Sequence, residues 1–173
     1  MPVFIALLRA VNVGGTGKLP MRQLKAVCEA AGFEAVRTYI ASGNVVFRSA
    51  KSEPQVKAAL EMGLEACIGK RVGVLVRTAA EIAAVLNENP FPHAVPGRTV
   101  AIFLDGPPPA DALKGVTGRK DEEIRLGRRE IYVHYGGGMA GSRLKIPAAQ
   151  AGTARNLNTV AKLAEISAGL PYG

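Results

Sequence analysis

The sequence predicts an α+β protein built from two related halves, and three observations carry this prediction. Short apolar runs typical of buried strands alternate with segments whose apolar residues recur at helical spacing. The 173 residues include 20 glycines and 11 prolines, which is typical of a chain with many turns. Hydrophobic residues make up 48% and charged residues 21%, so neither a disordered nor a membrane-spanning chain is expected.

The first strand and the first helix are indicated by a change of period. Residues 3–11 form a nearly continuous apolar run, the pattern of a strand that is buried on both faces. From Pro20 onward the apolar residues recur at helical spacing, and Gly32 suits the end of that helix. Proline is favoured in a first helical turn because its missing N–H would have no helical partner there, and glycine is favoured just after the last turn.

Turn and capping signals set the remaining elements of the first half. Ser42-Gly43-Asn44 is typical of a tight hairpin turn, and Ser52-Glu53-Pro54-Gln55 has the form of a capping box that begins a helix. Together these elements predict the β-α-β-β-α-β order of the ferredoxin-like motif. The expected strands cover residues 3–11, 36–40, 45–48 and 72–76, and the expected helices cover 20–32 and 52–68.

The second half predicts a related set of elements. Thr78-Ala79-Ala80-Glu81 is again a capping box, and Asn89-Pro90-Phe91-Pro92 ends the helix that it begins. Gly127-Arg128-Arg129 lies between two apolar runs and is typical of a hairpin turn. The expected elements are a strand over 99–104, a short helix over 110–114, strands over 124–126 and 131–135, a loop from the glycine run 136–138 to Asn156, and a last helix that reaches Ser167.

These patterns suggest an imperfect structural duplication. We expect a ferredoxin-like subdomain over residues 1–90 and a second α+β subdomain over residues 91–173, packed as one compact unit, although no repeat of individual residues is visible. The formal net charge is +8, and basic residues exceed acidic residues equally in both halves. Neither half is therefore a basic tail, and an anionic partner is plausible on charge alone.

A glycine-rich segment between the first strand and the first helix is the first candidate site. Its glycines allow the backbone to approach a ligand closely, Lys18 adds positive charge, and a helix N-terminus favours anions. A P-loop is excluded because Asn12 stands at the first glycine position and Leu19 replaces the hydroxyl residue that binds magnesium. The segment does not match the dinucleotide fingerprint either, because Pro20 stands where its third glycine belongs. A purely structural turn remains the alternative.

Two further segments share this chemistry. Residues 136–145 contain four glycines, Ser142 and two cations after a strand, and a surface loop is the alternative interpretation. In the segment 153–160, Asn156 or Asn158 could cap the last helix. Arg155 could hold a carboxylate or a phosphate in a fork if its side chain points to the N-terminus of that helix.

Familiar catalytic and metal-binding patterns are absent from the sequence. It contains no H-E-x-x-H, no G-x-S-x-G and no cysteine–histidine spacing for zinc, so we expect no metal and no cofactor. His134 is expected to pack or lie at the surface, and Asp121-Glu122-Glu123 to form a solvated turn. Phe4 and Phe47 are expected in the core, because the glycine–aromatic signature of RNA-recognition domains is missing.

The two cysteines and the first residues of the chain indicate the cellular compartment in which the protein is found. Cys28 and Cys67 fall in amphipathic segments without a disulfide pattern, which is typical of free thiols in a reducing cytoplasm. The apolar residues at the start end at Arg9 and lack a basic leader, so they predict a strand rather than a signal peptide. No apolar run approaches the ~20 residues that a membrane-spanning helix needs. We therefore expect a cytoplasmic protein.

Five ordered segments carry a resemblance to a known family. They are 7–15, 39–47, 76–78, 89–92 and 153–160, and in them the chain resembles the bacterial family known as domain of unknown function 1697. The resemblance implies a compact α+β protein and no particular activity. Leu157 departs from the family pattern, which has tryptophan there, and Pro147 interrupts a segment where the family has a longer helix. The polar positions of the motif and the neighbouring lysine give the candidate anion-binding residues: Arg9, Asn12, Gly14, Gly15, Lys18, Ser42, Asn44, Arg155, Asn156, Asn158 and Thr159.

Three functional hypotheses follow. The first is a binding module for an anionic ligand, either nucleic acid or a phosphorylated metabolite. The second is an enzyme that acts on a small anionic substrate in a cleft between the two halves, with Arg9, Lys18 and Arg155 positioning the anion. The third is a structural or interaction protein whose charge only aids solubility.

Overall fold

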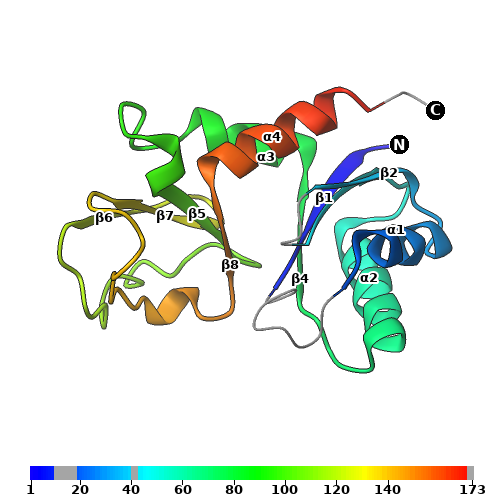
Figure 1. The fold of residues 1–173 in the computed structure, drawn as a ribbon, viewed down its shortest axis with the longest axis horizontal. Coiled ribbons are helices and arrows are strands. Elements are labelled where there is room, and N and C mark those ends of the chain that lie inside the picture. Colours follow the sequence, from blue (N-terminus) through cyan, green and yellow to red (C-terminus); the bar gives the residue numbers. More distant parts are fainter. Residues whose placement is uncertain (10–18, 40–42, 171–173) are drawn as a thin grey trace. The chain divides into compact units, whose positions relative to one another are not determined.

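The computed structural model describes residues 1–9, 19–39 and 43–170. This part of the chain is a mixed α+β structure with two four-stranded antiparallel sheets and four α-helices (Figure 1). Short 3-10 helices occupy Pro96–Arg98 and Pro147–Ala149. The strands are β1 (Val3–Leu8), β2 (Glu34–Tyr39), β3 (Asn44–Arg48), β4 (Val74–Thr78), β5 (Thr99–Phe103), β6 (Glu122–Leu126), β7 (Glu130–Tyr135) and β8 (Thr153–Asn156). The helices are α1 (Met21–Ala30), α2 (Glu53–Ile68), α3 (Ala79–Asn87) and α4 (Leu157–Ala168).

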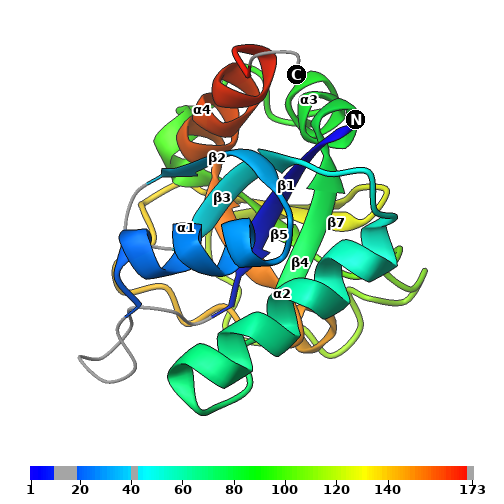
Figure 2. The same cartoon turned by 90° about the vertical axis from the view of Figure 1, so that its right-hand side faces the viewer.

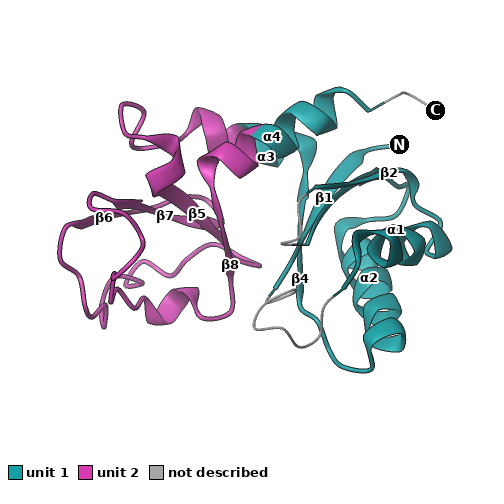
Figure 3. Cartoon of the chain, in the orientation of Figure 1, with its two compact units in different colours: residues 1–83, 162–173 teal, residues 84–161 magenta. Residues whose placement is uncertain are grey.

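The chain divides into two compact units (Figure 3). Unit 1 consists of residues 1–83 and 162–173, and unit 2 consists of residues 84–161. The first sheet belongs to unit 1 and the second sheet to unit 2, while α3 and α4 each contribute residues to both. The division into subdomains at residues 1–90 and 91–173 stays a prediction.

The first sheet has the strand order β2-β3-β1-β4, and its elements follow one another in the predicted order. The register places Leu7 of β1 opposite Asn44 of β3 and Leu75 of β4. Helices α1 and α2 lie on the same face of this sheet (Figure 2). Since side chains alternate along a strand, every second residue of β1 points towards these helices.

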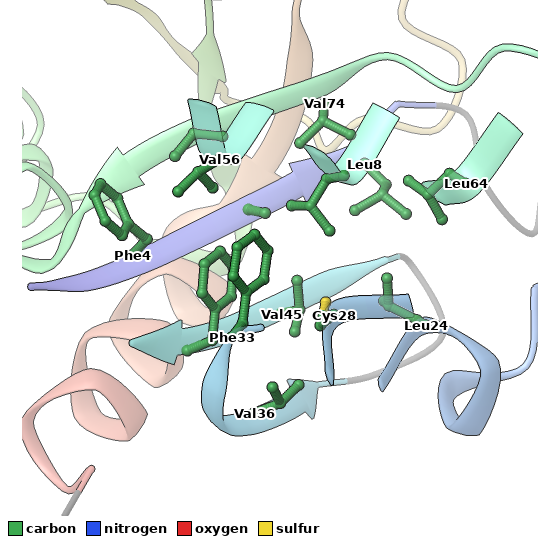
Figure 4. Packing of buried hydrophobic residues seen from close by; sticks show 14 of the residues in the cluster. Phe4, Leu8, Leu24, Cys28, Phe33, Val36, Val45, Val56, Leu64 and Val74 are labelled. Carbon is green, nitrogen blue, oxygen red and sulfur yellow. The ribbon is translucent and has the colours of Figure 1, made fainter. Parts of the chain in front are cut away.

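The core of unit 1 lies between that face and the two helices (Figure 4). The ring of Phe33 stacks on the ring of Phe47 with centroids 4.2 Å apart, and Phe4 lies 6.2 Å from Phe47. Such aromatic pairs add stabilisation beyond the area that they bury. Phe4 and Phe47 are therefore core residues, as predicted.

Hydrogen bonds confirm the predicted helix ends. The Ser52 N–H donates to Oε1 of Gln55 over 2.9 Å while the hydroxyl of Ser52 accepts from the Gln55 N–H, which completes the capping box of α2. Thr78 and Glu81 form the same pair of bonds at the start of α3. Gly32 has a φ of 88°, the left-handed conformation that glycine adopts just after a helix.

The second sheet has the strand order β6-β7-β5-β8, and it corrects two expectations. The short helix expected over 110–114 is wrong, because these residues form only turns. One helical turn fixes several dihedral angles for a single hydrogen bond and does not persist without further support. Residues 153–156, expected in a loop, form strand β8 because they pair with β5, with Asn156 opposite Val100 and Thr153 opposite Phe103.

Among the described residues, no helix combines the length and the apolarity needed to cross a membrane.

Candidate anion-binding site

The structure describes six of the eleven candidate residues. Arg9 and Asn44 belong to unit 1, whereas Arg155, Asn156, Asn158 and Thr159 belong to unit 2. The remaining five, which are Asn12, Gly14, Gly15, Lys18 and Ser42, lie outside the described residues.

Arg9 follows the last residue of β1 and is held against β4. Its backbone N–H donates to the carbonyl of Gly73 over 2.9 Å. Its side chain runs over Gly73, where a Cβ would lie only 3.1 Å from Cδ of Arg9. Gly73 therefore leaves the space in which the aliphatic part of the Arg9 side chain packs.

Asn44 starts β3 and secures the hairpin that joins β2 to β3. Its side chain is fully buried, and Nδ2 donates to the carbonyl of Tyr39 over 3.2 Å. The preceding Gly43 has a φ of 78°, and its carbonyl accepts from the Leu8 N–H over 2.9 Å. The hairpin predicted around Gly43 is thus present in its described part, and Asn44 has a structural role in it.

These contacts bring two parts of the motif to the same end of the first sheet. The end of β1 with Arg9 lies beside the start of β3 with Gly43 and beside Gly73 before β4. The candidate segments 10–18 and 40–42 directly follow Arg9 and directly precede Gly43 in the chain. Pairing of strands has therefore joined candidate residues that are far apart in sequence.

Arg155 lies in a strand, where the sequence predicted a loop. It is opposite Ala101 of β5 within β8, two residues before the first residue of α4. Its Nη1 donates to the hydroxyl of Thr153 over 2.7 Å and to the carbonyl of Ala154 over 3.0 Å. The side chain is 8% exposed, and burial lowers its pKa to about 10.

The other residues of the C-terminal segment serve the start of α4. Oδ1 of Asn156 accepts from the Thr159 N–H over 2.9 Å, which is the bond of an N-cap. Asn158 is exposed, and a Cβ at Gly97 would lie 3.4 Å from its Nδ2. Helix capping therefore accounts for Asn156 and not for Asn158.

The chain matches the family model of DUF1697, described as a protein of unknown function, over residues 1–132. The chain belongs to this family. A solved structure, that of the conserved bacterial protein SP0830 from Streptococcus pneumoniae, is 24% identical with a TM-score of 0.80, covering 96% of this chain and 98% of that one. At this identity the likeness shows the fold alone. No curated protein matches the chain.

The family model covers some of the candidate residues and not others. Arg9, Asn44 and the segments next to them lie within the matched residues of this DUF1697 protein. The segment 153–160 lies beyond them, although it was one of the five segments that carried the resemblance. The end of the first sheet is therefore the part of the candidate site that the family match covers.

Glu122 is a residue whose role the sequence analysis missed. The solvated turn expected around it is wrong, because Glu122 starts β6 and is 2% exposed. Its carboxylate accepts from the hydroxyl of Ser142 over 2.5 Å and from the Lys120 N–H over 2.6 Å. These bonds, led by that of Ser142, lower the pKa of Glu122. Alternation with Ile124, which faces the core, was the signal that Glu122 points inward.

Other titratable groups of the DUF1697 chain have structural surroundings. The ring of His134 packs against Phe91 with centroids 5.7 Å apart, in agreement with a packing role. Burial, and secondarily Glu29, raises the pKa of the Cys28 thiol to about 12, so this cysteine is not a nucleophile near neutral pH. Among the described residues, no three His, Cys, Asp or Glu side chains are grouped as metal ligands.

Proposed function

We propose that this protein binds an anionic ligand at the end of the first sheet where Arg9 lies. The observation that carries the proposal is the packing of the Arg9 side chain over Gly73, beside Gly43, the last residue before β3. A guanidinium whose aliphatic part is already packed loses less conformational entropy when it binds a phosphate or a carboxylate. Its fork of N–H groups matches the oxygens of these anions.

The surroundings of Arg9 support the same ligand class. The segment that follows Arg9 contains the glycines at positions 14, 15 and 17 and Lys18, and the whole chain carries a formal net charge of +8. Glycines allow backbone N–H groups to approach an anion without interference from a Cβ. We propose Asn12, Gly14, Gly15, Lys18, Ser42 and Asn44 as the residues that complete the site with Arg9.

Between the two ligand types, the burial of the first sheet favours a phosphorylated metabolite over nucleic acid. Proteins that stack bases on a sheet need an open face with aromatic side chains. Here α1 and α2 cover one face, with Phe4 and Phe47 inside that core, and Ile5 and Leu7 on the other face are fully buried. The ligand would therefore contact the end of the sheet rather than its face.

A titration with inorganic pyrophosphate tests this function. The wild-type chain should bind it, and Arg9→Ala should weaken binding by on the order of tenfold or more, because a hydrogen bond to a charged group contributes about 1.5–3 kcal/mol. Arg22→Ala removes the same charge from an exposed position on α1 and should bind like the wild type. Equal affinity of all three proteins would contradict the proposal. A short oligonucleotide in parallel should bind no better than pyrophosphate, with the steep salt dependence of backbone contacts if it binds at all.

A protein without a ligand is the second candidate, and specific contacts favour it. Asn44 holds a hairpin, Asn156 caps α4, and Arg155 bonds to its own strand. Each of these contacts gives a candidate residue a role in the fold. Under this alternative Arg9→Ala changes stability, and no anion binds at the end of the first sheet.

We also propose that the two sheets arose from duplication of a ferredoxin-like unit. Their strand orders, β2-β3-β1-β4 and β6-β7-β5-β8, correspond strand by strand. The helix that precedes β2 has only turns as its counterpart before β6, so the correspondence is imperfect. Free thiols at Cys28 and Cys67 support the further proposal of a reducing, cytoplasmic environment.

A further inference from the structure

The glycine-rich loop of unit 2 borders a groove that the proposed site at Arg9 does not include. Residues 117–122 and 137–145 line two hollows of about 450 and 520 Å³, which share Gly118, Ser142 and Arg143. Backbone bonds of 2.8 and 3.1 Å between Thr117 and Lys145 join the two segments. Gly118, with a φ of 70°, lies so close to Arg143 that a Cβ would come within 1.9 Å of its carbonyl oxygen. Two fixed segments therefore form this groove.

The charges that line the groove are mostly positive. Lys120, Arg143 and Lys145 are exposed there, and in the described part of the chain their side chains have no hydrogen bond or ion pair. Two carboxylates, those of Asp121 and Glu122, also line the groove. The Glu122 carboxylate accepts hydrogen bonds from Ser142 and from a backbone N–H, so only the Asp121 carboxylate is available to oppose an anionic ligand. Three available cations thus face one available carboxylate, and such a groove attracts a ligand with several negative charges.

A smaller and more apolar hollow adjoins the groove. It measures about 240 Å³ and shares Leu144 and Lys145 with the larger hollow of the pair. Ile102, Tyr135 and Ile146 contribute apolar surface to it, and Gln150 contributes an amide. Burial, followed by the charge of Glu122, raises the pKa of Tyr135, so its hydroxyl keeps its proton. An aromatic ring, aliphatic side chains and one amide suit a flat heterocycle with polar edges.

We propose that this groove binds a nucleoside polyphosphate. The phosphates lie beside Lys120, Arg143 and Lys145. The base occupies the adjoining hollow beside Tyr135, with Gln150 at its edge. This site shares no residue with the anion site at Arg9, because every residue that forms it belongs to unit 2.

Calorimetric titration of the full chain with metal-free adenosine triphosphate tests the assignment. The nucleotide should bind at least tenfold more tightly than inorganic triphosphate, because the base adds contacts in the apolar hollow. The double substitution Arg143→Ala with Lys145→Ala should weaken nucleotide binding by at least tenfold. Lys51→Ala, an exposed charge change in unit 1, should leave it unchanged. Arg9→Ala, which removes the anion site proposed on unit 1, should still bind the nucleotide through the groove, so failure of one site is distinguishable from failure of the other.

Several results would overturn the assignment. One is the absence of nucleotide binding, and another is an equal loss of affinity in Lys51→Ala and in the double variant. If inorganic triphosphate binds Arg9→Ala as tightly as the nucleotide does, the base makes no contact in the apolar hollow. Preference for an oligonucleotide over adenosine triphosphate would assign the groove to a nucleic-acid backbone instead.

Discussion

The hydroxyl of Ser142 donates a 2.5 Å hydrogen bond to the buried carboxylate of Glu122. Ser142 lies in the glycine-rich loop and Glu122 starts an edge strand, so this bond attaches the loop to the second sheet. The same Ser142 oxygen accepts from the Leu144 N–H over 3.3 Å, which closes a local turn within the loop. The groove of unit 2 keeps its form partly through this one serine.

The Glu122–Ser142 bond predicts a pH-dependent stability. The pKa of Glu122 is lowered in the folded chain, so the carboxylate stabilises the fold at pH values above its unfolded pKa. That contribution is lost as the pH falls from about 4.5, the ordinary value, towards the lower folded value. The unfolding temperature of Glu122→Gln should therefore fall less steeply over this acidic range. Glu123→Gln, at the exposed neighbour, should keep the wild-type profile, and superimposable profiles for all three proteins would contradict the account.

Gly118 should tolerate no side chain. A Cβ there meets the carbonyl oxygen of Arg143 at 1.9 Å, in addition to the cost of a positive φ. Gly141→Ala is a matched control, because Gly141 also has a positive φ, of 81°, but open space around it. We expect the control to lose about 1–2 kcal/mol of unfolding free energy and Gly118→Ala to lose clearly more. Urea denaturation measures both, and equal losses would mean that the two segments are not in close contact.

The cap of α4 should be measurable by the same method. Asn156→Ala removes the acceptor for the Thr159 N–H and should cost ~0.5–2 kcal/mol. Asn156→Asp keeps an acceptor and should restore most of the stability. Asn158→Ala, at the exposed asparagine, should have little effect. A larger loss in Asn158→Ala than in Asn156→Ala would reverse the assignment of the cap.

The two cysteines should differ in reactivity. Cys28 is buried with a pKa raised to about 12, whereas Cys67 is exposed. A thiol reagent at neutral pH should therefore modify one cysteine rapidly in the native chain and both after denaturation. Cys67→Ser should abolish the rapid phase. Rapid labelling that persists in Cys67→Ser would show that the core around Cys28 opens.

Local signals account for the parts of the fold that the sequence predicted well. The Ser52 and Thr78 capping boxes involve residues three positions apart, and Gly32 acts within its own turn. Strand β8 was missed because its four residues are mostly polar and adopt an extended conformation only through pairing with β5. Propensity is a weak guide where pairing between distant segments decides the conformation.

In the candidate site, too, local signals were predicted from the sequence and the effects of pairing between distant strands were not. Motif spacing identified Arg9 and Asn44 but not their common position, which depends on the pairing of β1 with β3 and β4. Arg155 was expected in a loop and lies within a strand, because its extended conformation depends on pairing with β5. Glu122 was assigned to solvent because charged residues are seldom buried, yet its hydrogen bonds compensate for its burial.

The position of anion binding tests the central claim most directly. Inorganic pyrophosphate added to the isotopically labelled chain at low salt should shift the backbone amide signals of Arg9, Gly43 and Gly73 in a two-dimensional NMR spectrum. The shifts should saturate with one affinity and be lost in Arg9→Ala. Unchanged signals for these three amides at saturating pyrophosphate would contradict an anion site at the end of the first sheet.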